Sequence, residues 1–457
     1  MPRLSIAVLL VVLLTFCHAA IGQTRGLLIQ NAHLVSLDPQ QGDRRGADVL
    51  VRDGRIVAIG QRLEADGAER IDALGMILLP GLVDTHTHLW LSAARGLFRN
   101  TPETDYFALK KHLARHYTPE DIRVGTYFGA IETLASGVTT TVDFFHNLRS
   151  PAHLEAAEQA LRQSGIRARL LYGAHDDLAP HDAIDLAHLA ATAGRARPDG
   201  RITLGLGWRG VGEGKPAVVA TGRRELAAAR KLGLPVSVHS GGKRNAALID
   251  SGLLGQDVQI VHGTGATPAQ LAAFRAAGSA LSLTPVTEQR VGYGLTVLSD
   301  YAAVGRLGLG IDGPALAGSA DLFANMRLLA LTESGAAKKE TAVAPRRILE
   351  LATLEAARSI GMDDEIGSIA PGKRADLILL DTGALNMAQS GDDDPLALIV
   401  YSATPANVDT VIVDGVVRKR GGHLVDVDVP QVLDGVRASI GAIQARAGRL
   451  PAQPKRD

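Results

Sequence analysis

The sequence predicts an α/β protein whose main part is a (β/α)₈ barrel and whose two ends together build a small β-sandwich. Three observations predict this fold. Between about residues 83 and 315, short apolar segments alternate with amphipathic ones, as in buried parallel strands joined by helices. These strand-and-helix units number about eight, which is the number that closes a barrel. The segments on either side of this region resemble short hairpin strands instead.

Residues 1–22 are predicted to be an export signal. Arg3 precedes an apolar run that ends at Cys17, is short for a bilayer span and is followed by small residues. We therefore expect cleavage after Ala19 or Gly22, and a periplasmic or secreted protein with no stable membrane association. An uncleaved anchor is the alternative. Cys17 is the only cysteine, so the mature chain has no disulfide and no thiolate ligand.

Residues 23–81 and 367–426 are predicted to form the two parts of the β-sandwich. Residues 47–59 contain two apolar runs around an Asp-Gly turn, and residues 411–417 repeat this pattern near the other end of the chain. Neither set of strands is long enough to bury a core alone, so we expect the two to pair. Residues 427–457 are predicted to be a helical tail, because their apolar residues fall near helical spacing.

Residues 82–366 are predicted to be the barrel. The helices between its strands have clear boundaries: Thr118-Pro119 opens one that ends at Gly137, and Ser150-Pro151 opens the next. Strand ends are expected near His88, Phe145, His175, Arg209, His239, His262, Pro285 and Asp312. In such a barrel the carboxyl ends of all strands meet at one mouth, so side chains that are distant in the sequence converge there.

Histidines and a carboxylate stand at several of these strand ends. His86 and His88 are two residues apart and would project from the same face of a strand. His239, His262 and Asp312 each end another apolar strand. Nitrogen and oxygen ligands of this kind favour zinc or another divalent ion, such as iron or manganese. Taken alone, His262 could equally be a core histidine, and Asp312 a helix N-cap.

The charge balance excludes nucleic acid as a partner. The chain has 48 basic and 48 acidic residues and no long run of like charge. With 46% hydrophobic residues it has ample material for a large core. The histidines and the carboxylate at the strand ends favour a small-molecule substrate as the partner. The sequence leaves the oligomeric state open, a homo-oligomer included.

Several motifs together resemble the amidohydrolase superfamily, and more narrowly its cytosine deaminase-like and chlorohydrolase-like branch. The motifs are PGLVDTHTH (80–88), GVTTTVD (137–143), VH (238–239), VHG (261–263), GIDG (310–313) and PGKRADL (371–377). The resemblance implies a metal-bearing barrel, a composite β-sandwich and hydrolysis at a carbon attached to nitrogen or another leaving group. It also implies that His86, His88, His239 and Asp312 bind the metal. His262 would orient water and substrate or complete the coordination shell.

Two departures from the family pattern refine this prediction. The fourth strand, residues 202–209, offers no lysine to bridge two metals, so one metal ion is expected. Asp312 could accept a proton from the water that this ion activates. Gly242 stands three residues after His239, where deaminases of this branch carry a glutamate. Because glycine transfers no proton, Glu288 is predicted as a substitute acid; the alternative is an exposed loop carboxylate.

Further residues at the mouth are predicted to bind substrate. These are Trp90, His175 and Arg209, of which Arg209 could pair with a substrate carboxylate through two hydrogen bonds. The alternative for Trp90 and Arg209 is packing beneath the loops. His175 could equally be a solvent-facing histidine.

The predicted function is that of a metal-dependent hydrolase. It would use metal-activated water to cleave non-peptide C–N bonds in a small cyclic amide, amidine or N-heterocycle. One alternative is a non-catalytic homologue that keeps its metal and binds a small ligand. Another is a hydrolase of ester, lactone or carbamate bonds, whose better leaving groups need less help from a proton donor.

Overall fold

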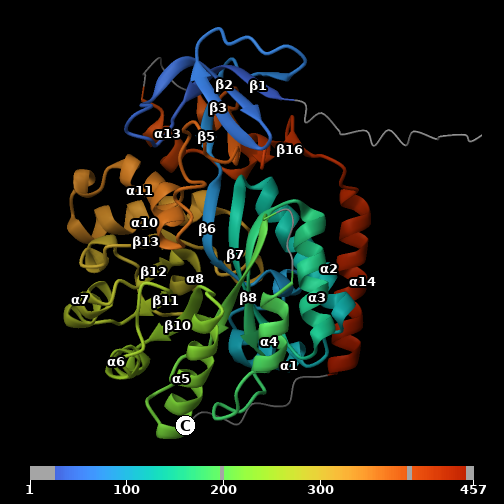
Figure 1. Cartoon of the computed structure of the whole chain (residues 1–457), viewed down its shortest axis with the longest axis vertical. Coiled ribbons are helices and arrows are strands. Elements are labelled where there is room, and N and C mark those ends of the chain that lie inside the picture. Colours follow the sequence, from blue (N-terminus) through green and yellow to red (C-terminus); the bar gives the residue numbers. More distant parts are fainter. Residues whose placement is uncertain (1–25, 196–199, 389–393, 449–457) are drawn as a thin grey trace, which may run out of the picture.

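The computed structural model describes residues 26–195, 200–388 and 394–448, which form two β-sheets with their helices (Figure 1). The predicted export signal, residues 1–22, lies outside the described residues. Within the described part of the chain, no helix is both long and apolar enough to cross a bilayer.

Eight parallel strands follow one another in chain order around the barrel. They are β6 (Leu82–Thr87), β7 (Val138–Leu148), β8 (Arg167–Ala174), β9 (Ile202–Trp208), β10 (Val236–Gly241), β11 (Val258–Thr264), β12 (Ala280–Leu283) and β13 (Leu307–Leu309). The chain just after β13 returns to β6, where the Asp312 amide donates to the His86 carbonyl over 2.8 Å. The predicted barrel is therefore confirmed, and its first and last strands meet beside two candidate ligands.

Helices lie between and after the barrel strands, and most of them surround the barrel. They are α1 (Tyr106–Ala114), α2 (Pro119–Ala135), α3 (Pro151–Ser164), α4 (Leu186–Ala193), α5 (Pro216–Lys231), α6 (Lys243–Asp250), α7 (Pro268–Ala276), α8 (Pro285–Arg290), α9 (Pro314–Ala317), α10 (Leu322–Ala337), α11 (Pro345–Leu351), α12 (Leu354–Ser359) and α13 (Leu396–Tyr401). Helix α2 begins at Pro119 because Thr118 and Asp121 form a capping box. Helix α3 ends at Gly165, whose φ of 80° suits glycine.

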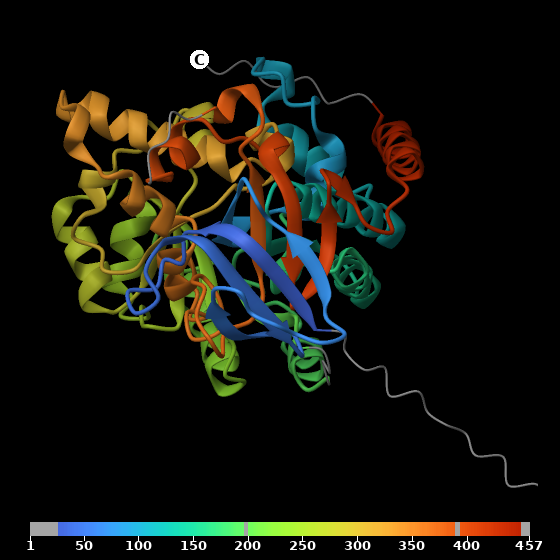
Figure 2. The same cartoon turned by 90° about the horizontal axis from the view of Figure 1, so that it is seen from above.

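The second sheet combines strands from both ends of the chain (Figure 2). Its strands are β1 (Leu27–Leu34), β2 (Arg44–Arg52), β3 (Arg55–Gly60), β4 (Glu69–Asp72), β5 (Met76–Pro80), β14 (Leu377–Asp381), β15 (Val408–Val413), β16 (Val416–Arg420) and β17 (His423–Leu424). Strands β5 and β14 join the two ends in antiparallel register. The predicted composite β-domain is confirmed, as one nine-stranded mixed sheet whose core includes Ile29, Val49 and Leu377.

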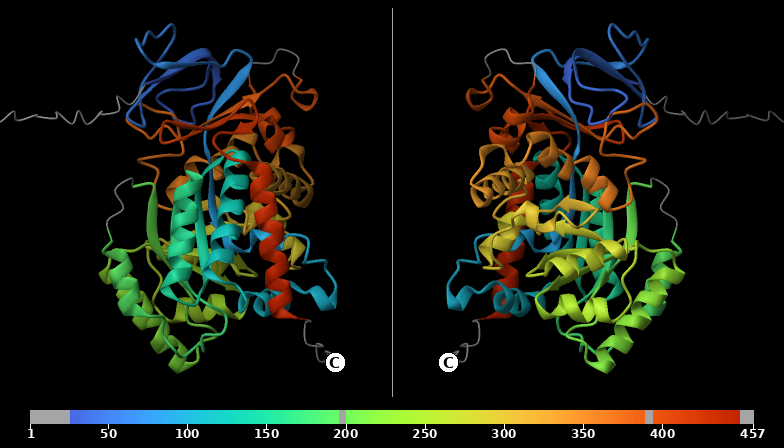
Figure 3. Two further views of the ribbon diagram at one scale, coloured as in Figure 1. Left: turned by 90° about the vertical axis from the view of Figure 1, so that its right-hand side faces the viewer. Right: turned by 90° about the vertical axis from the view of Figure 1, so that its left-hand side faces the viewer.

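Two contacts tie the ends of the chain to the barrel. Arg167, at the start of β8, pairs with Asp376, just before β14, at 2.6 Å. Helix α14 (Val429–Ala447) lies beside α2 (Figure 3), and its Ser439 donates to Asp121 over 2.6 Å. The barrel mouth lies at the opposite ends of the strands, away from the second sheet.

Candidate metal centre

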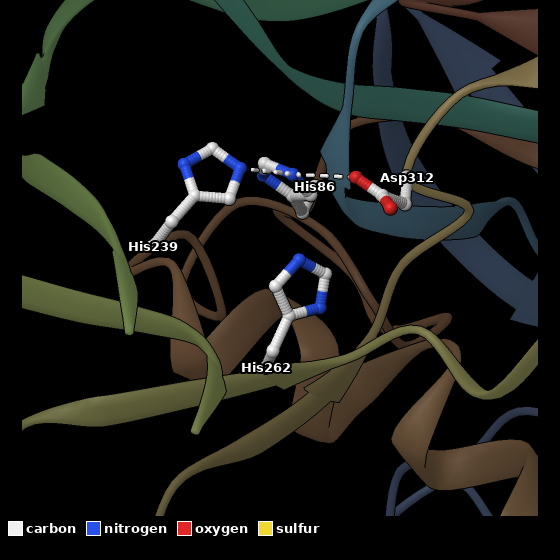
Figure 4. A group of neighbouring side chains, drawn as sticks. All are labelled: His86, His239, His262 and Asp312. Carbon is white, nitrogen blue, oxygen red and sulfur yellow. Dashed lines mark hydrogen bonds and ion pairs between the residues drawn. The ribbon is translucent and has the colours of Figure 1, made fainter. Parts of the chain in front are cut away.

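Four side chains from separate strand ends converge at the barrel mouth (Figure 4). His86 lies on β6, His239 on β10 and His262 on β11, while Asp312 follows β13. One nitrogen or oxygen atom from each of these residues lies within 4.8 Å of those of the others. The topology of the barrel thus brings together residues that are up to 226 positions apart in the sequence.

His86 lies at the centre of the group. Its Nε2 atom is 3.0 Å from Asp312 Oδ1 and 3.2 Å from His239 Nε2. His88 stands next to these four residues, with its Nε2 atom 3.3 Å from the same Asp312 oxygen. The Phe144 carbonyl lies 2.8 Å from His88 Nδ1, and this contact turns Nε2 of His88 toward the centre.

Two residues of the centre have a left-handed backbone. The φ angles are 67° at His262 and 64° at Asp312, values that L-residues rarely adopt. Such conformations carry strain of about 1–3 kcal/mol and persist where the surrounding structure imposes them, most often at functional sites. His262 lies near the end of β11 and Asp312 just after β13, so the turns that begin at the mouth aim their side chains at the centre.

Burial sets the charge of the group. It lowers the pKa of His86 to about 3 and the pKa of His239 well below 6.5, so both imidazoles are neutral near pH 7. Burial also disfavours the charged form of Asp312, but hydrogen bonds with His86 and His88 outweigh it and hold the Asp312 pKa well below 3.8. Neutral imidazole nitrogens and one carboxylate are the donors that a divalent cation requires. The residues present therefore fit a metal ion.

Glu288 lies behind this centre. It is 1% exposed, and its Oε1 atom accepts hydrogen bonds from His262 Nδ1 over 3.1 Å and from the Thr284 amide over 2.9 Å. Its other oxygen accepts from Thr296 over 2.6 Å. This corrects both alternatives predicted for Glu288. It is neither an exposed loop carboxylate nor placed to protonate a substrate, because its oxygens are engaged behind His262 and it does not line the cavity.

A cavity of about 780 Å³ opens above the centre. His175 lines it, as predicted for a substrate contact, and its role in binding remains a prediction. Arg209 also lines the cavity, but its guanidinium donates to Glu225 over 2.8 Å and to backbone carbonyls of residues 178–182. We therefore assign Arg209 to holding this loop, in place of the predicted carboxylate contact.

Trp90 is also corrected. It is fully buried, packs against the rings of Tyr117 and His146, and is absent from the cavity lining. It lies two residues after His88, so it supports the wall of the site from behind. The alternative of packing beneath the loops describes it better than substrate contact does.

The sequence of this chain matches a known protein family. The model of the amidohydrolase family matches residues 77–418, about three quarters of the chain. The chain belongs to the amidohydrolase family. Together with the His and Asp site, this confirms the predicted class of enzyme, a metal-dependent hydrolase that acts on carbon–nitrogen bonds other than peptide bonds.

Two relatives of this amidohydrolase match over almost their whole length. The 5-methylthioadenosine/S-adenosylhomocysteine deaminase of Desulforudis audaxviator is 30% identical, over 89% of this chain and 96% of the relative. The 5'-deoxyadenosine deaminase of Methanosarcina acetivorans is 27% identical, over 92% of this chain and 99% of the relative. The chain thus spans the full architecture of these enzymes.

Solved structures show the same fold. A zinc-bound adenosine deaminase from Xanthomonas campestris superposes with a TM-score of 0.79, at 24% identity, over 92% of this chain and 98% of the other. The zinc complex of atrazine chlorohydrolase TrzN from Arthrobacter aurescens TC1 also has a TM-score of 0.79, at 23% identity, over 91% and 100% of the two chains.

The amidohydrolase carries site residues that the sequence did not predict. Lys110 and Asp176 line the cavity and form an ion pair of 2.9 Å. Lys110 lies on α1, within the long connection between β6 and α2, where no motif or spacing marks it. Glu225 on α5 is 1% exposed and holds Arg209. Only the three-dimensional contacts reveal these roles.

Proposed function

We propose that this amidohydrolase removes an amino group from an N-heterocycle by hydrolysis, with one divalent ion, zinc, held by His86, His88, His239 and Asp312. The convergence of these ligands with His262 at the base of one cavity carries the proposal. The nitrogen and oxygen donors suit zinc, and the curated relatives named above are deaminases of adenine nucleosides.

The residues of the centre divide the reaction between them. A bound divalent ion lowers the pKa of water to about 7 and so supplies a nucleophile at neutral pH. Asp312 accepts the proton that the attacking water loses, because its carboxylate stays charged and lies beside the histidine ligands. His262 turns Nε2 toward the cavity, since Glu288 binds Nδ1, and there hydrogen-bonds the oxygen that adds to the ring.

The cavity supports a substrate of nucleoside size. Its volume of about 780 Å³ falls within the range of small-molecule sites, which is roughly 300–1,000 Å³. Its walls combine aromatic surface from Tyr106 and Phe107 with polar groups such as His175. Such a lining can stack a heterocycle and hydrogen-bond its substituents.

Substrate screening of the full-length enzyme tests the proposal. We expect ammonia release from one or more aminated purine nucleosides, pyrimidines or triazines, and about one zinc ion per chain by metal analysis. Asp312→Asn should lower kcat by about 100-fold or more, because it removes both a ligand and the proton acceptor. The proposal would be refuted if the metal-loaded enzyme released no ammonia from any substrate of the panel, or if Asp312→Asn left turnover unchanged.

Gly242 favours a second candidate function. The glutamate that protonates the substrate ring in related deaminases is replaced by a residue without a side chain. A substrate whose leaving group needs no proton, such as a halide, an ester or a lactone, would suit this site as well. Parallel assays of matched amino and chloro heterocycles distinguish the two candidates, because only deamination releases ammonia.

We also propose that the enzyme works outside the cytoplasm. The support comes from the sequence of residues 1–22, with its apolar run and small residues before the first strand. Expression of the full chain followed by cell fractionation and N-terminal sequencing tests this. A mature N-terminus at residue 20 or 23 in the periplasm or medium is expected, and an intact leader in the cytoplasm would contradict it.

A further inference from the structure

A buried lysine stands at the wall of the metal-centre cavity. Lys110 on α1 is 9% exposed and lines the same cavity as His88, His239 and Asp312. Its ammonium group contacts Asp176 Oδ2 at 2.9 Å and His146 Nε2 at 3.3 Å. The amidohydrolase chemistry described so far does not use this group.

Two of the three N–H groups of the Lys110 ammonium have acceptors in the protein. An ammonium can only donate, so Nε2 of His146 must accept, and the proton of that imidazole lies on Nδ1, which donates to the Phe144 carbonyl over 3.2 Å. Asp176 accepts a second N–H of Lys110. An ammonium has three N–H groups, so one remains for a molecule in the cavity.

Lys110 is also close to the ligands. The His146 ring that it contacts lies 4.3 Å, centroid to centroid, from the ring of His88. His88 Nε2 in turn lies 3.3 Å from Asp312 Oδ1. A single imidazole therefore separates the ammonium from the ligand His88, and both residues line the cavity that would hold the heterocycle.

The reaction needs a proton donor, and Lys110 can fill this role. An amine leaves a ring carbon only after it gains a proton, and Gly242 offers no acid. The backbone at Gly242 has φ 55° and ψ −127°, a conformation that disfavours any side chain there. Glu288 is enclosed behind His262. Besides Asp312, which takes up the proton of the attacking water, Lys110 is a proton-bearing group that lines the cavity.

We propose that Lys110 is the proton donor to the departing nitrogen, with Asp176 and His146 holding its ammonium in place. This inference rests on the proposed deamination. Water adds to the ring carbon and gives its proton to Asp312, while Lys110 gives a proton to the amino nitrogen as the C–N bond breaks. The products are the hydroxylated heterocycle and ammonia. Solvent then returns a proton to Lys110 and removes the one on Asp312.

Two variants and a control separate this role from a structural one. Lys110→Met removes the charge, whereas Lys110→Arg keeps the pair with Asp176 but presents a guanidinium, which holds its protons too firmly to act as an acid. Lys111→Met is the control, because Lys111 lies on the same helix and is exposed. Each variant is assayed on a 6-aminopurine nucleoside and on its 6-chloro analogue, whose chloride leaves without a proton.

We expect both Lys110 variants to lose about 100-fold or more in kcat on the amino substrate and less than about threefold on the chloro substrate. KM, metal content and melting temperature should match those of the wild type and of Lys111→Met. Equal losses on both substrates, or a loss confined to KM, would assign Lys110 to substrate binding and overturn the proposal. Unchanged turnover would overturn it too. A failure of the proposed function is distinct, because the wild-type enzyme would then release no ammonia from the amino substrate.

Discussion

At the scale of single residues, Glu288 illustrates how a buried carboxylate can act through another side chain. Its Oε1 atom binds His262 Nδ1 at 3.1 Å, and Thr284 and Thr296 bind the carboxylate as well. These bonds hold the imidazole in the tautomer that leaves Nε2 free for the centre. Glu288 is therefore a positioning residue.

Substitution of Glu288 distinguishes positioning from acid catalysis. Glutamine keeps an acceptor for His262 Nδ1, so Glu288→Gln should cost less than about tenfold in kcat. Glu288→Ala removes the acceptor and should cost about 10–100-fold in kcat or metal affinity. Steady-state kinetics and metal titration measure both effects. If Glu288→Gln were as inactive as Glu288→Ala, the carboxyl proton itself would be required and the positioning role would be wrong.

Residues that end apolar strands are the ones that the sequence predicts best. His86, His239, His262 and Asp312 could be predicted because each ends an apolar strand, and a barrel brings such ends together. Arg209 also ends a strand, yet its guanidinium turns to Glu225, a residue on α5. The direction of a long side chain depends on partners from other segments, and no local pattern records them.

At the scale of elements, the turn between β10 and α6 shapes the catalytic mouth. Gly242 caps α6 with φ 55° and ψ −127°, and its amide donates to the Thr264 carbonyl over 2.9 Å. A Cβ atom at Gly242 would meet nothing within 4 Å. Glycine is therefore required by the backbone conformation and not by lack of space.

We accordingly expect Gly242→Ala to lower the free energy of unfolding by about 1–3 kcal/mol, the range for a residue held in a sparsely populated backbone region. Urea denaturation followed by circular dichroism measures the change. Lys243→Ala, at the next position and in helical conformation, is the control and should change stability by less than about 0.5 kcal/mol. Equal stability of Gly242→Ala and the wild type would show that the turn can relax at no cost.

At the scale of the whole molecule, a buried ion cluster joins the barrel to the second sheet. Arg167 at the start of β8 is 2% exposed and binds both oxygens of Asp376, at 2.6 and 3.0 Å. The Asp414 amide donates to Asp376 over 2.7 Å, and the Asp414 carboxylate contacts Arg167 at 3.2 Å. The sheet from the chain ends thus closes the face of the barrel opposite the metal centre.

Removing one partner of this cluster should destabilise the protein more than it affects the reaction. Asp376→Ala leaves the Arg167 guanidinium buried with only Asp414 beside it, and loss of one member of a buried ion pair typically lowers stability by about 3–5 kcal/mol. The exposed pair of Asp434 and Arg437 on α14 provides the control, since Asp434→Ala should cost less than about 1 kcal/mol. Urea denaturation measures both variants.

KM and kcat of Asp376→Ala, assayed at a temperature where it remains folded, should stay within about twofold of the wild type, because the cluster lies at the far end of the strands from the ligands. A small loss of stability would mean that the interface between barrel and sheet depends on its apolar contacts and that the ion cluster is dispensable.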